Sequence, residues 1–172
     1  MRGTAKARRL EEFLSHQGAV VEIARIMTAA PQFHVLCKNE MNREIEFHDS
    51  TLKEIIYNGD EVVLCFDEAY VHHSEGIPGL DKGTGWVQRI DLVCHGVSVI
   101  ELPDDLPNDL DFGFYVINNE KTENMMKLPF ETKGEIEIVL ITQYGKRLQL
   151  KAKSAFTKEV GKARYIEDFH GI

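Results

Sequence analysis

Hydrophobic and polar positions alternate with a period of two along most of the chain after residue 40. Between residues 86 and 94, Ile90 and Leu92 share one face while Arg89 and Asp91 share the other. This period is typical of half-buried β-strands, and the alternating runs recur at hairpin spacing. The pattern predicts a mainly β fold, an antiparallel β-sandwich or open barrel of about seven to nine short strands.

Two hairpins are predicted from turn signals. In the first, Tyr57-Asn58-Gly59 is expected to form a three-residue bulged loop with Gly59 left-handed, because this keeps Leu52 on the same face as Leu64. In the second, Gln143-Tyr144-Gly145 is expected to form a similar loop. The apolar residues that would then face one another across the second hairpin are Ile136, Ile138 and Leu140 against Leu148, Leu150 and Ala152.

Residues 1–40 have a different character from the rest. Residues 1–29 have helix-forming composition with two apolar stripes divided by Gly18, and Pro31 ends the helical pattern. We expect residues 1–40 to form a helical or disordered leader and linker, an N-terminal helical appendage to an antiparallel β domain at 41–172.

Charge is unevenly distributed over these two parts. The chain of 172 residues carries a formal charge of −8, and residues 1–40 hold six Lys or Arg against four Asp or Glu. Residues 41–172 hold fourteen against twenty-four, a net charge of −10. An acidic body disfavours nucleic-acid binding, which depends on Lys and Arg, and suits a soluble protein or one that meets a basic partner.

The cysteines and the apolar runs bear on location. The three cysteines include no C-x-x-C pair, which indicates neither a disulfide framework nor a zinc knuckle and fits a reducing compartment. No apolar run approaches the roughly 20 residues of a membrane-spanning helix. We therefore expect a cytoplasmic protein that does not enter the membrane; the sequence does not indicate its oligomeric state.

The connection from Tyr70 to Trp86 is the main candidate site, because long connections within a compact domain are often functional. It contains glycines that permit left-handed turns in a loop folding back on the sheet. We expect a non-enzymatic module, without a cofactor, that binds a protein partner or small ligand here. The candidate binding residues are Tyr70, His72, His73, Glu75, Asp81 and Trp86.

Two alternatives use the same stretch. A divalent metal ion could be bound by His48 and His72 with Glu75 and Asp81, since imidazole and carboxylate are common ligands, in a metal-binding protein or metal-dependent enzyme. Adjacent residues on a strand point to opposite faces, so only one of His72 and His73 could join His48.

A carbohydrate-binding module is the second alternative. It would use Trp86 and Tyr70 side by side as a stacking platform. The structural interpretation of Trp86 is a core residue at the exit of the loop, with its indole N–H bonded to a loop carbonyl.

The stretches F-H-D-S-T-L at 47–52 and H-S-E-G-I-P-G-L-D-K-G-T-G-W at 73–86 resemble motifs of uncharacterised small bacterial β-rich domains. These domains begin with a His-Asp-Ser or His-Asp-Cys element, and some are similar to immunity proteins. The resemblance covers residues 44–170 and implies a β fold in the bacterial cytoplasm. It implies no activity.

Overall fold

The computed structural model describes residues 41–171, and the predicted leader lies outside them. The described chain forms nine strands that pair antiparallel in one sheet, which confirms the mainly β prediction. The strands are β1 (Asn42–Asn58), β2 (Glu61–Ser74), β3 (Gly83–His95), β4 (Ser98–Glu101), β5 (Asn108–Ile117), β6 (Glu120–Glu123), β7 (Met125–Leu128), β8 (Glu131–Thr142) and β9 (Arg147–Phe169). The prediction that all strands are short is wrong for β1, which has 17 residues, and for β9, which has 23.

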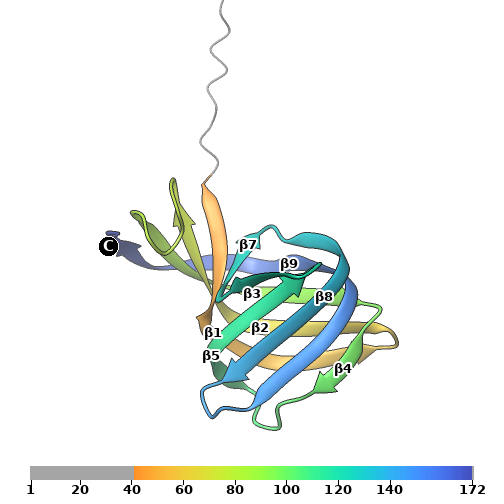
Figure 1. Ribbon diagram of the computed structural model, residues 1–172. Helices are drawn as coiled ribbons and strands as arrows, with labels where there is room; N and C mark the ends of the chain where they lie inside the picture. The colour runs from red at the N-terminus through yellow and green to blue at the C-terminus, as the bar shows by residue number, and fades with distance from the viewer. Residues whose placement is uncertain (1–40, 172) are drawn as a thin grey trace, which may run out of the picture. The chain divides into compact units, whose positions relative to one another are not determined.

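The sheet closes on itself. Its neighbours run in the order β6-β5-β8-β9-β3-β2-β1-β7, and β1 also pairs with β5 through Thr51↔Asp109 and Leu52↔Asn108. Strands β1, β2, β3, β9, β8 and β5 therefore form a ring (Figure 1). Within residues 41–171 no helix is long and apolar enough to cross a membrane.

The ring surrounds one hydrophobic core. Alternate residues of the six ring strands point inward, and their large side chains form the core, with Phe47 and Phe66 fully buried and their ring centroids 6.2 Å apart. Gly113 of β5 provides space for this packing, because a Cβ there would lie 2.7 Å from the Phe47 ring and 2.8 Å from Leu140. The core accounts for the alternation in the sequence.

The two hairpin predictions have different outcomes. Pairing of Ile138 with Leu150 and of Leu140 with Leu148 is confirmed, and Gly145 has φ of 76° in the predicted three-residue loop. The first hairpin was predicted wrongly. Asn58 pairs with Glu61, so the loop has only two residues, although its Gly59 is left-handed with φ of 69°.

Bulges within β1, not the turn, correct the register of this hairpin. A register shift between Leu52 and Glu54 allows Leu52 to pair with Phe66 and Ile55 with Leu64. Ile55 therefore packs against the core, whereas Ile56 is exposed. A larger irregularity lies at residues 47–50, which we call the F-H-D-S bulge.

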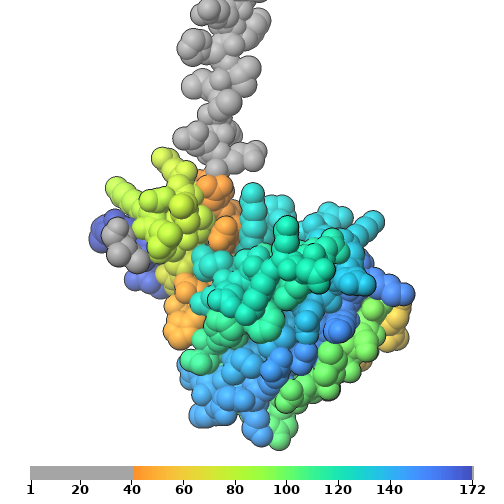
Figure 2. Space-filling model, in the orientation of Figure 1, coloured from red at the N-terminus to blue at the C-terminus, as the bar shows by residue number. Residues whose placement is uncertain are grey.

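The ends of four strands extend beyond the ring (Figure 1). They pair in the order β9-β3-β2-β1 and consist of residues 164–169, 83–87, 70–74 and 42–46. We call these four segments the projecting sheet. Residues 75–82, the tip loop, connect β2 to β3 at its end and lie at the surface (yellow-green in Figure 2).

Candidate functional site

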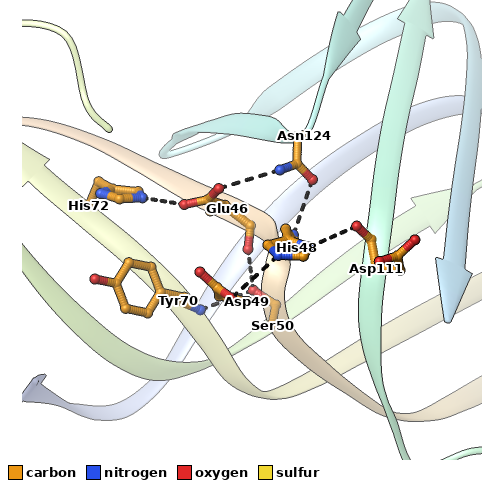
Figure 3. A network of polar contacts seen from close by, with 8 residues as sticks. All are labelled: Glu46, His48, Asp49, Ser50, Tyr70, His72, Asp111 and Asn124. Carbon is orange, nitrogen blue, oxygen red and sulfur yellow. Dashed lines mark hydrogen bonds and ion pairs between the residues drawn. The ribbon is translucent and has the colours of Figure 1, made fainter. Parts of the chain in front are cut away.

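The F-H-D-S bulge is held by hydrogen bonds that replace the missing strand pairing. Ser50 is fully buried; its Oγ donates to the carbonyl oxygen of Glu46 at 2.5 Å and accepts from the Tyr70 N–H at 3.0 Å (Figure 3). The hydroxyl thus joins β1 to β2 where their ladder is interrupted. β1 changes neighbours across this bulge, from β7 at residues 43–46 to β5 at 51–52.

His48 and Asn124 fix the other side of the bulge. The His48 Nδ1–H donates to the Asp111 carbonyl oxygen at 2.8 Å, and the His48 backbone N–H donates to Asn124 Oδ1 at 3.1 Å (Figure 3). The bond to Asp111 is the main cause of a raised pKa of His48. This imidazole therefore stabilises the closure of the sheet.

His72 and Glu46 form a pair on the outer face of the projecting sheet. Nε2 of His72 lies 2.6 Å from Oε2 of Glu46, and the His72 residue is only 5% exposed (Figure 3). The hydrogen bond from His72 holds the pKa of Glu46 below its usual range. Gly79 of the tip loop covers the imidazole, since a Cβ at Gly79 would lie 3.9 Å from the ring atoms of His72.

Tyr70 extends this outer network to the last strand. The Tyr70 side chain passes over Gly85 of β3, and its hydroxyl donates a hydrogen bond to Glu167 Oε1 at 2.9 Å. A Cβ at Gly85 would lie 2.0 Å from that hydroxyl oxygen, so the contact requires glycine there. Burial, followed by the bond to Glu167, raises the pKa of Tyr70.

The inner face of the projecting sheet carries a second network. His73 stacks on Trp86 with ring centroids 5.4 Å apart, and Trp86 meets Tyr165 edge-on at 5.5 Å. Arg43 donates from Nε to Nε2 of His73 at 3.2 Å and makes two bonds to the Glu159 carboxylate at 2.8 and 2.9 Å. Burial and the neighbouring Arg43 lower the pKa of His73. Both faces of the projecting sheet are thus cross-linked by side chains.

Trp86 packs against the core as expected, but its indole N–H donates to the Thr84 hydroxyl at 2.8 Å and not to a carbonyl. The predicted separation of the adjacent histidines is confirmed, because His72 faces Glu46 while His73 faces Trp86.

Hydrogen bonds connect the backbone of the tip loop internally and to the adjoining strands. Residues 77–80 form a turn in which the Leu80 N–H donates to the Ile77 carbonyl oxygen at 3.1 Å, with Pro78 second and Gly79 (φ 78°) third, as a type II turn requires. The Asp81 carboxylate accepts the Ile77 N–H at 2.6 Å.

The two ends of the loop are also fixed. Ser74 is 1% exposed, and its Oγ donates to the Lys82 carbonyl oxygen and accepts the Gly76 N–H, each at 3.0 Å. The Asn42 side chain donates to the Gly76 carbonyl oxygen at 2.6 Å. The predicted loop that folds back on the sheet is therefore present, with Gly79 as its left-handed glycine.

Apolar side chains and a hollow lie at this tip. Ile77 is 60% exposed and Leu80 is 52% exposed, although the backbone between them is fixed. A hollow of about 640 Å³ lies beside the loop. It is lined by residues of the loop and of neighbouring strands: Met41, Glu75, Gly76, Asp81, Lys82, Gly83, Thr84 and Asp168.

Of the four residues of the metal alternative, Glu75 and Asp81 line one hollow, and the two histidines do not. His48 lies at the F-H-D-S bulge, His72 is bonded to Glu46, and Asp81 accepts the Ile77 N–H. Within residues 41–171, no group of three or more His, Cys, Asp or Glu side chains is arranged to hold a metal ion. The predicted ligands are therefore not brought together, and metal binding by the chain stays a prediction.

The two aromatic residues of the carbohydrate alternative are also separated. Tyr70 pairs with Val87 and Trp86 with Val71, so strand alternation directs Tyr70 and Trp86 to opposite faces. The aromatic neighbour of Trp86 is instead Tyr165. Of the predicted binding residues, His73 stacks on Trp86, Tyr70 meets His72 edge-on with ring centroids 5.0 Å apart, and Glu75 and Asp81 line one hollow.

Partners from distant parts of the chain were missed by sequence reasoning. Glu167 lies 97 residues from Tyr70, and Glu159 lies 116 residues from Arg43. The pattern of Glu44, Ile45 and Glu46 placed two carboxylates on one face of a strand, which was a signal for a polar outer face. Nothing in the pattern showed that His72 would meet one of them.

Comparison of the chain with protein-family models, with curated proteins and with solved structures found no match.

Proposed function

We propose that this chain is a binding module and that the tip loop is its recognition element. The observation that carries the proposal is the exposure of Ile77 and Leu80 on a backbone held by hydrogen bonds at its turn and at both ends. The exposure of large apolar side chains is explained if a partner covers them.

The rigidity of the platform supports the same proposal. Glu46, His72, Tyr70 and Glu167 join the strands on the outer face of the projecting sheet, and Arg43 joins Glu159 on the inner face. A loop that is already ordered loses less conformational entropy on association than a flexible one. Such a loop can therefore bind through a small surface.

Site-specific photo-cross-linking in living cells tests the proposal. A photoreactive phenylalanine analogue is placed at position 77, at position 80 or at position 144, where Tyr144 is 79% exposed on the opposite hairpin loop. We expect one discrete cross-linked product shared by positions 77 and 80 and absent at position 144. The proposal fails if positions 77 and 80 give no product, or if all three positions give the same products.

A further inference from the structure

We infer that the partner of the tip loop is an extended protein segment in which apolar residues alternate with arginine or lysine. This inference rests on the proposed function and specifies the chemistry of the partner. The surface concerned, here called the tip surface, consists of Ile77, Leu80 and the residues that line the adjacent hollow.

Apolar anchoring comes from three side chains. Ile77 and Leu80 belong to one turn, and Met41, which lines the hollow, is 43% exposed. Binding energy at protein interfaces is concentrated in a few side chains that become fully desolvated. A partner with apolar residues spaced along an extended backbone would bury these three.

The negative charge around the hollow favours a basic partner. The hollow is lined by the carboxylates of Glu75, Asp81 and Asp168 against the single cation of Lys82. The domain at 41–172 adds a net charge of −10. Carboxylates form short charge-assisted hydrogen bonds with guanidinium groups, and complementary potential accelerates association.

An aromatic ring beside the hollow favours the same chemistry. Tyr165 is 47% exposed and packs edge-on against Trp86, whose indole N–H donates to Thr84 in the lining of the hollow. Arginine stacks on aromatic faces while it binds carboxylates, which lysine does less well. Anionic lipid and nucleic acid carry negative charge, so this surface would repel both.

The probe is an acetylated and amidated peptide Leu-Arg-Leu-Arg-Leu, titrated into the full ¹⁵N-labelled chain. Its control replaces both arginines with citrulline, which keeps the shape of the side chain and removes its charge. We expect saturable shifts of the amide signals of Gly76, Lys82 and Thr84 and of the Trp86 indole N–H. The affinity should fall with added salt, and the citrulline peptide should bind at least about tenfold more weakly.

Matched variants separate local charge from total charge. Glu75→Gln with Asp168→Asn should weaken binding of the arginine peptide about three- to tenfold, because each exposed charge pair contributes modestly. Glu120→Gln with Glu131→Gln changes the net charge equally at exposed positions outside the hollow and should leave binding unchanged. Ile77→Ser with Leu80→Ser should weaken binding about tenfold or more.

The inference is overturned if the arginine peptide produces no shifts, if the citrulline peptide binds equally well, or if both charge-variant pairs weaken binding to the same extent. These failures can be distinguished from failure of the proposed function. A shared cross-linked product at positions 77 and 80 would retain the binding module while excluding a basic segment as its partner.

Discussion

The F-H-D-S bulge and the tip loop both invert the usual distribution of polar and apolar side chains. In the bulge a polar residue, Ser50, is fully buried; in the tip loop two apolar residues, Ile77 and Leu80, are more than half exposed. Burial of Ser50 is explained within the chain, because its hydroxyl bonds to both β1 and β2. Exposure of Ile77 and Leu80 has no such internal explanation.

This contrast separates a polar segment that builds the fold from a polar segment that presents a surface. In the bulge, the His48 ring and the Ser50 hydroxyl bond to main-chain groups of other segments of the sheet. In the tip loop, hydrogen bonds such as that of Asp81 fix the loop backbone and leave apolar side chains outside. Substitutions in the first region should change stability, and those in the second should change binding.

The largest loss of stability is expected from Glu46→Ala, which leaves the buried His72 without its acceptor. Removing one member of a buried pair is strongly destabilising; because Glu46 is partly exposed, we expect a loss of about 2–3 kcal/mol in the free energy of unfolding by urea titration.

Glu44→Ala is the matched control for that variant. Glu44 lies on the same face, and burial raises its pKa, so its charge is disfavoured in the folded state. Its removal should cost little. Equal losses for both variants would show that the His72 pair does not stabilise the projecting sheet.

Ser50→Ala should have the next largest effect, about 2 kcal/mol in the same measurement. The substitution leaves the Tyr70 N–H and the Glu46 carbonyl oxygen without their bridging partner at a buried position. Ser98→Ala, at an exposed position of β4, is the control and should have no measurable effect. An unchanged midpoint for Ser50→Ala would contradict the structural role of the F-H-D-S bulge.

A smaller effect is expected in the pH dependence of stability, and it has opposite signs for His73 of the projecting sheet and His48 of the bulge. The lowered pKa of His73 means that the unfolded chain binds the proton more tightly. The contribution of His73 to the free energy of unfolding is therefore present above about pH 6.5. It is lost as the pH falls towards the pKa that His73 has in the folded protein. Because the pKa of His48 is raised, its contribution to the free energy of unfolding is present below about pH 6.5. This contribution is lost as the pH rises through the pKa that His48 has in the folded protein.

Urea titrations at pH 5.5 and pH 7.5 measure these slopes. His73→Asn should reduce the loss of stability on acidification, whereas His48→Asn should increase it. If both variants changed the loss of stability on acidification in the same direction, this distinction between the inner-face network and the bulge would be wrong.

The smallest effect on stability is expected from Ile77→Ser with Leu80→Ser. Both side chains are mostly exposed, so the free energy of unfolding should change by less than about 0.5 kcal/mol. Loss of binding without loss of stability would assign these side chains to recognition. A large destabilisation would assign them to the fold.

Predictability from sequence follows the regularity of the strands. The β8–β9 hairpin was predicted in register because Ile138 and Leu140 alternate without interruption and Gly145 ends the loop. The register of the β1–β2 hairpin was not predicted, because it is set by bulges within β1. Such bulges leave no signal in a pattern with a period of two residues.

The candidate site was predictable only in part, for a related reason. The stretch 70–86 was identified from its composition, and Glu75 with Asp81 does line a hollow. The partners Glu159 and Glu167 belong to the last strand, and pairing of β9 with β3 is determined by closure of the whole ring. A local pattern carries no information about such long-range contacts.

The length and position of β9 also have a consequence during synthesis of the protein. β9 follows the other eight strands in the chain and pairs with β3, β4 and β8. While residues 147–169 remain inside the ribosome, β3 and β8 each present an edge without its native neighbour, and such edges promote aggregation of nascent chains. Completion of the ring is therefore coupled to the emergence of this strand.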